Sequence, residues 1–371
     1  MTVAPQHAML DPANTCHGIM RSVCPRLLLA LVVMITGCAA SEPVASRPRP
    51  SLRPPRTTVA LPLRAGMKPE KITMLNVRVP EAWELPGVVG HLQQYRIAAG
   101  ENLLEVARES GVGFRELRDA NPRIDEWEPK PGVELVVPSR WILPRATSYR
   151  GLVANIPEMR LYLFPEDTEP GERVPVLTWP IGIGAEEAPS PVGAFTVAAK
   201  DVNPTWVVPA SIYRTMDNPQ HVVPPGPDNP LGDYRIRLSL DLYSIHGTND
   251  PWTVGRLTTH GCIRLYPEDI AALFPLVGRG TPGEFVYEPV KVGQSRGRVY
   301  VEVHQDVYQL IPDLEAHAAD EVRRAGLGAR VDPEALRTAV RAKTGVPVDV
   351  TRGAPAPPVD RVRDGHLALG D

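Results

Sequence analysis

The chain has 371 residues, of which 42 are Pro and 30 are Gly, and this content argues against a single all-helical fold. Hydrophobic residues make up 43% of the chain, which is enough for the cores of two or three units and excludes global disorder. Lys and Arg number 40 against 43 Asp and Glu, a net charge of −3, which argues against a polycationic nucleic-acid binder.

Residues 1–37 have the pattern of a targeting segment. Two arginines precede an apolar run, Leu27–Ile35, which has the length of a signal-peptide core and is too short to span a bilayer. The run ends in Ile35-Thr36-Gly37-Cys38, which resembles a bacterial lipobox and implies lipidation of Cys38 as the new N-terminus. An ordinary signal peptide cut near Ala40 is the alternative, and a start at Met1 or at Met20 stays open.

Cysteine usage then singles out one thiol. Cys16 and Cys24 leave with the signal segment and Cys38 carries the lipid, so Cys262 is the free thiol of an exported chain. A leftover thiol in an oxidising compartment is a liability unless it is buried or used, which makes Cys262 the first candidate for chemistry.

Residues 38–90 predict a Pro- and Arg-rich linker with few large apolar side chains. Residues 93–139 predict a small α+β unit in the order strand, helix, helix, strand, at Tyr95–Ile97, Leu103–Gly111, Phe114–Ala120 and Leu135–Pro138. This unit resembles a LysM domain (βααβ), through its Tyr, Gly-Glu, Asn-Pro and Pro-Gly positions. The resemblance implies binding to peptidoglycan glycan; a structural spacer is the alternative.

Residues 149–289 predict a mainly β domain, because short β-like runs alternate with Gly and Pro turns. The runs are Gly151–Asn155, Arg160–Phe164, Val174–Ile181, Phe195–Ala198, Leu242–Ile245 and Glu284–Tyr287, with one helical stretch at Asp269–Val277. Residues 298–350 predict an appendage with a strand at Arg298–His304 and two polar helices around Asp320–Ala325 and Pro333–Lys343. Residues 351–371 predict a disordered tail.

The lone thiol and two histidines gather within residues 244–265. His246 and Cys262 are 16 positions apart, a spacing that lets a strand and a returning loop bring them together. A thiol with an imidazole is the minimum for nucleophilic acyl transfer, because His can take the thiol proton and later return it to a leaving amine. Gly261 permits a tight backbone whose amides can point at an oxyanion. On residue types alone, a structural role for these side chains stays open.

The string His246 followed by Thr259-His260-Gly261-Cys262 resembles the active-site signature of the L,D-transpeptidase (YkuD-type) family, and further blocks resemble its ErfK/YbiS group. The resemblance implies a YkuD-like β-sandwich with a short helix over residues 149–289. It implies that Cys262 is the nucleophile and His246 its base. It further implies an oxyanion loop of Thr259, His260, Gly261 and Gly247, and substrate contacts by Arg264 and Trp206.

The resemblance also implies the reaction. Cys262 would form an acyl-enzyme with a peptidoglycan tetrapeptide stem, release D-Ala, and pass the acyl group to an amine of a second stem or of an envelope lipoprotein. Water as acceptor would make the enzyme an L,D-carboxypeptidase, and a non-catalytic wall-binding lipoprotein is the rival reading. We expect no cofactor and no metal, because His246 and His260 lack a third ligand at metal spacing. The expected location is the periplasm, with a lipid anchor in the outer membrane.

Overall fold

The computed structural model describes residues 73–214 and 220–354. The predicted signal segment and Cys38 lie outside the described residues. Within the described ranges, no helix combines the length and the apolar character needed to cross a membrane.

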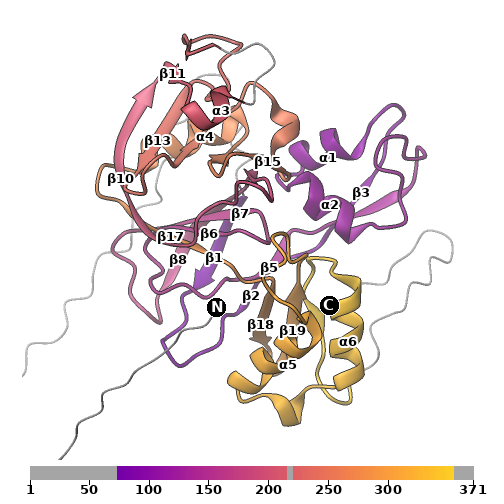
Figure 1. Cartoon of the computed structure of the whole chain (residues 1–371). Helices are drawn as coiled ribbons and strands as arrows, with labels where there is room; N and C mark the ends of the chain where they lie inside the picture. The colour runs from indigo at the N-terminus through magenta and orange to yellow at the C-terminus, as the bar shows by residue number, and fades with distance from the viewer. Residues whose placement is uncertain (1–72, 215–219, 355–371) are drawn as a thin grey trace, which may run out of the picture. The chain divides into compact units, whose positions relative to one another are not determined.

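A nine-stranded mixed sheet carries the candidate site (Figure 1). In spatial order its strands are β1 (Thr73–Arg78), β8 (Arg173–Pro180), β7 (Arg160–Phe164), β6 (Gly151–Asn155), β17 (Pro282–Val286), β10 (Gly193–Val202), β13 (Tyr234–Leu238), β14 (Ser244–His246) and β16 (Ile263–Arg264). The ranges predicted for β6 and β7 coincide with the observed ones. The mainly β character predicted for this part of the chain is confirmed.

The first strand differs from the sequence expectation. We expected a linker through residue 90, whereas β1 pairs antiparallel with β8 over six positions. Leu75 and Val77 are buried while Met74 and Asn76 face outward, so a half-buried strand alternation lies inside the expected linker. The sheet therefore extends beyond residues 149–289.

The sheet changes partners along β10. Residues 193–196 pair with β17 and residues 197–202 pair with β13, and the register shifts between Val197 and Ala199. Such a bulge bends a strand and increases its twist. Side chains from both halves of the sheet share one core, among them Leu161, Trp179, Ile236 and Ile263. The two halves of the sheet therefore pack around a common core.

Shorter elements surround this core. The helix α4 (Pro267–Leu273) starts with Pro at its first position and continues into a 3₁₀ turn, Phe274–Leu276, which matches the predicted helical stretch. A parallel pair joins β9 (Ile183–Gly184) to β15 (Leu257–Thr259). The hairpin of β11 (Trp206–Val207) and β12 (Val222–Val223) carries α3 (Ala210–Tyr213).

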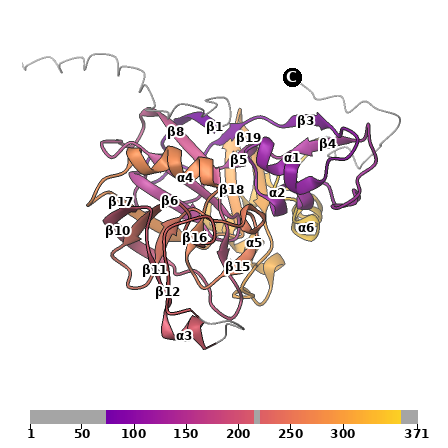
Figure 2. The same ribbon diagram turned by 90° about the horizontal axis from the view of Figure 1, so that it is seen from above.

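The predicted order strand, helix, helix, strand is present as β3 (Gln93–Arg96), α1 (Leu103–Glu109), α2 (Phe114–Ala120) and β4 (Glu134–Val137), with β3 paired to β4. Figure 2 shows α1 and α2 side by side next to these strands. Asn102 caps α1 by accepting a hydrogen bond from the amide of Glu105. The apolar faces of both helices pack with β1, β6, β7 and β8 in a second core. Glu116 of α2 also forms a buried ion pair with Arg160 of β7, at 2.8 Å.

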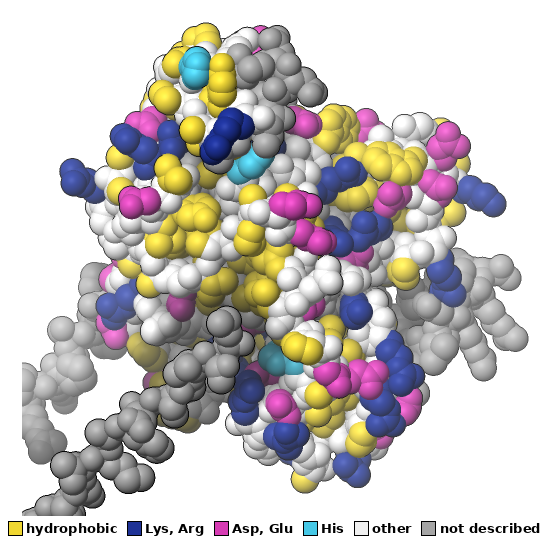
Figure 3. Space-filling view, viewed as in Figure 1, with side chains coloured by type: hydrophobic (Ala, Val, Ile, Leu, Met, Phe, Trp, Pro, Cys, Tyr) yellow, Lys and Arg dark blue, Asp and Glu magenta, His cyan; other side chains and the backbone are white. Residues whose placement is uncertain are grey.

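The C-terminal segment forms a third packed unit. It contains β18 (Val290–Ser295), β19 (Arg298–Val303), α5 (Leu314–Arg324), α6 (Pro333–Ala342) and β20 (Val348–Asp349). Aspartates cap both helices, and their apolar faces share a core with β18 and β19. Charged side chains of both signs cover the outer surface of these helices (Figure 3), including the pairs Arg323–Asp320 and Arg337–Glu334. Thr351 bridges to Val331, so order extends past residue 350, where we expected the disordered tail to begin.

The remaining strands join these units. The strand β2 (Val88–Gly90), also inside the expected linker, pairs with β5 (Arg140–Ile142). In the chain, β2 precedes the α1–α2 unit and β5 follows it. Both strands pack near β18.

Candidate active site

Three adjacent strands place the predicted catalytic side chains on one face of the sheet. Ile236, Ile245 and Ile263 point into the core from β13, β14 and β16. Side chains alternate along a strand, so the neighbours of these isoleucines point to the opposite face. In the observed register Arg235 lies opposite His246, and His246 lies opposite Arg264. The same register places Ser244 opposite Arg237, in the row that also contains Cys262.

His246 is buried, and a backbone carbonyl orients its ring. Nδ1 lies 2.7 Å from the carbonyl oxygen of Gly247. A carbonyl only accepts, so Nδ1 carries the proton and Nε2 presents a free lone pair. Burial, together with the positive charges of Arg264 and Arg235 on either side, lowers the pKa of His246 to about 3, against the Gly247 carbonyl, which raises it. The imidazole is therefore neutral at physiological pH.

Cys262 lies between β15 and β16, partly exposed. Its Sγ lies 3.6 Å from the Ser244 hydroxyl oxygen and 3.7 Å from the carbonyl oxygen of Leu242. Cys262 therefore makes its side-chain hydrogen bonds with Ser244 and Leu242 and none with His246. His246 lies two residues beyond Ser244 on β14, at the next position on the same face. The structure thus places the imidazole on β14 and the thiol directly before the neighbouring strand β16, one row apart, with the thiol turned toward Leu242.

The loop before Cys262 is fixed by its own side chains. The Thr259 hydroxyl donates to the carbonyl oxygen of Cys262 at 2.6 Å and accepts from the amide of Gly261 at 3.1 Å. Gly261 has φ +97°, and a Cβ there would lie 2.5 Å from the Tyr243 ring. Because Thr259 already uses the Gly261 amide, that amide is not free to bind an oxyanion, unlike the sequence expectation for this loop.

Two residues absent from the predicted site support this loop from outside. The Ser190 hydroxyl donates to the Gly261 carbonyl at 3.0 Å and accepts from the Gly184 amide at 2.9 Å. The Ser190 amide in turn donates to the Tyr308 hydroxyl, which donates to the Gly184 carbonyl. Tyr308 is 118 residues from Ser190, so no local pattern connects them. The one local signal that could have pointed to Ser190 is the pair of prolines that flank it in the sequence.

The other predicted site residues lie at different places in the fold. The amide of Gly247 donates to the Tyr234 carbonyl at 3.1 Å, and a Cβ at Gly247 would lie 3.1 Å from Ile270. His260 is exposed. Burial lowers the pKa of Arg264, whose Nε has no hydrogen-bond partner in the described part of the chain. Trp206 lies on the separate β11–β12 hairpin and is half-buried.

One cluster outside this face has metal-ligand chemistry. Ligand atoms of Glu158, Glu302 and His304, all buried, lie within 4.8 Å of one another. The Nζ of Lys291 lies 2.7 Å from a carboxylate oxygen of each glutamate, and His304 Nε2 lies 2.7 Å from Glu302. Lys291 thus provides at this cluster the positive charge that a cation would bring. The cluster joins β18 and β19 to the β6–β7 turn.

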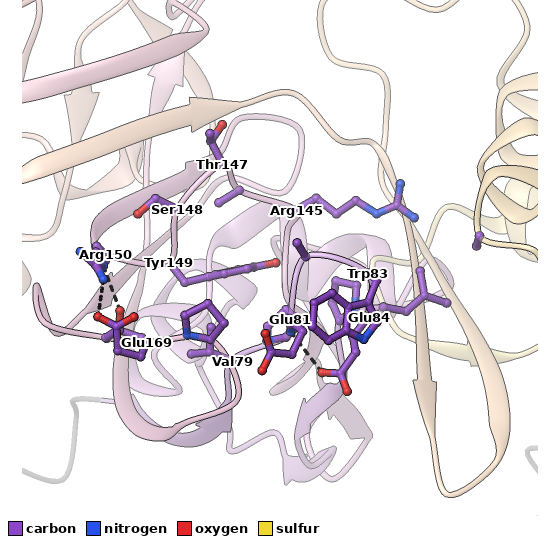
Figure 4. Close-up of a pocket in the computed structure, with 18 of the residues that line it drawn as sticks. Val79, Glu81, Trp83, Glu84, Arg145, Thr147, Ser148, Tyr149, Arg150 and Glu169 are labelled. Atoms are coloured by element: carbon purple, nitrogen blue, oxygen red, sulfur yellow. Dashed lines mark hydrogen bonds and ion pairs between the residues drawn. The ribbon is translucent and has the colours of Figure 1, made fainter. Parts of the chain in front are cut away.

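A hollow of about 830 Å³ lies apart from Cys262 (Figure 4). Segments 79–86, 145–150 and 168–170 line it, with Arg324 and Ala325. Trp83 stands at it with 81% of its surface exposed, and Arg150 pairs with Glu169. None of the predicted site residues lines this hollow.

Known proteins match the chain over the segment that carries Cys262. The family described as the L,D-transpeptidase catalytic domain (YkuD) matches residues 149–292. The protein named "Probable L,D-transpeptidase YcfS" of Escherichia coli (strain K12) is 37% identical over 275 residues, which cover 70% of this chain and 83% of that protein. "Probable L,D-transpeptidase YbiS" of the same strain is 36% identical, covering 70% and 88%. "Probable L,D-transpeptidase ErfK/SrfK" is 34% identical, covering 67% and 82%.

Proposed function

The chain belongs to the L,D-transpeptidase family, and from that premise we propose that it forms a thioester between Cys262 and a peptidoglycan tetrapeptide stem. The terminal D-Ala leaves, and an amine of a second stem or of an envelope lipoprotein then takes the acyl group. The observation that carries this proposal is the shared face of β14 and β16, on which a neutral, oriented imidazole lies one row from a partly exposed thiol.

In the proposed mechanism Nε2 of His246 takes the thiol proton after Cys262 turns from Leu242 toward the ring. Sulfur attacks the carbonyl carbon of the third residue, and the C–N bond to D-Ala breaks. The imidazolium returns its proton to the leaving amine. The acceptor amine then attacks the thioester carbonyl carbon and gives its proton to His246. The C–S bond breaks, and the imidazolium returns the proton to the sulfur of Cys262, which restores the thiol.

The backbone amides of His260 and Cys262 are the proposed oxyanion donors, because the Gly261 amide is bonded to Thr259. Thr259, Gly261 and Gly247 then act by holding the loop and the His246 strand in place. Arg264 and Trp206 are proposed substrate contacts, and His260 is exposed on the loop before Cys262. No cofactor has a part in the proposed mechanism.

The test is thioester formation, followed by intact mass, with a disaccharide-tetrapeptide and with a carbapenem, whose strained lactam is an acyl donor. We expect Cys262→Ser to abolish the mass shift, because an alcohol has a far higher pKa than a thiol. His246→Ala should slow acylation by about two to four orders of magnitude, the range for losing a general base. His260→Ala should be milder; a loss as large as that of His246→Ala would contradict the division of roles.

We propose, as a second activity, that residues 93–139 form a LysM domain that binds wall glycan. Their strand–helix–helix–strand order and the β3–β4 pairing support this. Deleting the unit would expose the core it shares with the sheet, so a surface variant is the better test. Trp127→Ala, at a side chain 55% exposed, should weaken sedimentation with purified sacculi, whereas Trp83→Ala outside the unit should not. Equal sedimentation of the two variants would contradict glycan binding through Trp127 and favour the role of a structural spacer for this unit.

We propose that Cys38 is lipidated and holds the protein at a membrane, the outer membrane in our proposal, facing the periplasm. The lipobox-like string ending at Cys38 supports this. Several acyl chains make a stable anchor where one does not, so the mature protein should fractionate with membranes. Cys38→Ala should release or mislocalise it; unchanged membrane fractionation would overturn the anchor.

A further inference from the structure

A hollow of about 220 Å³ lies on the β10–β13 side of the turn whose Leu242 contacts the thiol. Its lining includes Arg235 and Arg237 of β13 and the turn residues Leu242 and Tyr243. Leu242 is the residue whose carbonyl oxygen lies 3.7 Å from Cys262 Sγ, and Tyr243 is the ring against which Gly261 packs. The hollow therefore shares its wall with the nucleophile loop.

The two arginines of this hollow differ in how their charge is balanced. Arg237 is exposed and pairs with Asp201 of β10, with Nε to Oδ2 at 3.1 Å. Arg235 is half-buried and forms no ion pair among residues 73–214 and 220–354. Its Nε donates to the Ser244 hydroxyl at 3.2 Å. The acidic residue of the lining, Asp241, is exposed and forms no ion pair with Arg235.

Ser244 also fixes the direction of the Arg235 guanidinium. One Ser244 hydroxyl contacts both Arg235 Nε and Cys262 Sγ, the latter at 3.6 Å. With Nε used, the outer edge of the guanidinium, its two Nη groups, is left to bind a ligand. A planar guanidinium held in this way recognises a carboxylate through two parallel hydrogen bonds.

We propose that this hollow is the subsite for a carboxylate of the acyl-donor peptide, bound by the Nη groups of Arg235 beside Cys262. This inference rests on the proposed function, because it names how the donor is held at the same nucleophile. The stem peptide carries such groups at its C-terminus and on the side chain of its third residue. Arg235 is thus a residue that determines specificity for the donor, distinct from Arg264 of β16.

The test compares donors that differ in one charge. The rate of D-Ala or D-Ala-amide release, as kcat/KM, is measured with the disaccharide-tetrapeptide and with versions amidated at one carboxylate at a time. We expect Arg235→Gln to lower kcat/KM for the parent donor about 10- to 100-fold, the range for losing a charge-assisted hydrogen-bonded pair. With the donor whose recognised carboxylate is amidated, wild type and Arg235→Gln should be equal. Arg173→Gln, an exposed arginine of β8, is the matched control.

The outcomes separate this inference from the function on which it rests. A loss in Arg235→Gln that is equal for every donor, amidated or not, would assign Arg235 to thiol reactivity and overturn the subsite. No loss for the parent donor would overturn it as well. Absence of any wild-type thioester or release would overturn the proposed function itself, and the subsite with it. Circular dichroism of Arg235→Gln excludes unfolding as the cause of a loss.

Discussion

His246 lies buried between two arginines, and this placement links acid stability to one imidazole. Its pKa is about 3 in the folded protein against 6.5 for the free side chain. Between these values the unfolded chain binds a proton that the folded protein does not, so stability falls as pH falls from 6.5 toward 3. Above pH 6.5 the group is neutral in both states and has no effect.

We therefore expect His246→Gln to reduce the loss of unfolding free energy between pH 6.5 and pH 4 by up to about 3 kcal/mol. Urea unfolding at several pH values measures this. His91→Gln, at an exposed histidine, is the control and should leave the slope as in wild type. An unchanged slope in His246→Gln would show that the imidazole is free to protonate in the folded state.

Two features of the structure disfavour a side chain at position 261: the positive φ of Gly261 and the nearby Tyr243 ring. At φ +97° an Ala is strained, and its Cβ would meet the Tyr243 ring. We expect Gly261→Ala to cost about 1–3 kcal/mol of unfolding free energy and to slow thioester formation, because the loop that carries Cys262 must shift. Gly278→Ala is the control, since Gly278 has open space around its Cβ position. Equal stability of both variants would contradict the strain argument.

At the scale of elements, the segment after β19 supports the nucleophile loop. Tyr308 lies beyond the matched range 149–292, yet its hydroxyl bonds both Gly184 and Ser190. We expect Tyr308→Phe to lower kcat for thioester formation about tenfold with KM unchanged, because Tyr308 positions the loop and does not face the donor hollow. The control is Tyr300→Phe, because the Tyr300 hydroxyl forms no hydrogen bond within the described residues. If Tyr308→Phe reacts as fast as Tyr300→Phe, the Tyr308 hydroxyl does not help to position the loop that carries Cys262.

The same elements show how far sequence predicts this fold. Gly151–Asn155 and Arg160–Phe164 were predictable because turn residues bound each run and set its ends. The strand β13 was missed although its sequence has the alternation of a half-buried strand, with three buried apolar side chains separated by Arg235 and Arg237. The pair His246 and Cys262 came from a motif, whereas Ser190 and Tyr308 depend on tertiary contacts that no local spacing encodes.

At the scale of the whole described chain, Lys291 holds the C-terminal unit against the sheet electrostatically. It lies between Glu158 and Glu302, both fully buried, and Tyr162 donates to Glu158. Burial would raise the pKa of Glu158, but the charges of Lys291 and His304 outweigh it and lower it. Removing one partner of a buried ion pair leaves an uncompensated charge.

We expect Lys291→Met to lower the unfolding free energy by about 3–5 kcal/mol. Arg337→Met, which breaks an exposed pair with Glu334, should change it by less than about 1 kcal/mol. Denaturant unfolding of both variants measures the difference. A small effect of Lys291→Met that matches Arg337→Met would mean that water reaches the cluster and screens its charges.

The place of β1 has a mechanical consequence. β1 is the edge strand at one end of the nine-stranded order, and β16, which follows Cys262, is at the other end. Tension on the chain before Thr73 therefore enters the sheet through the six β1–β8 pairs, with seven strands between that strand and β16. β1 would peel away first, and the nucleophile would be the last part of the sheet to bear the load. When the chain is pulled from its N-terminal side, β1 would detach while β14 and β16 keep their register and hold the thiol in place.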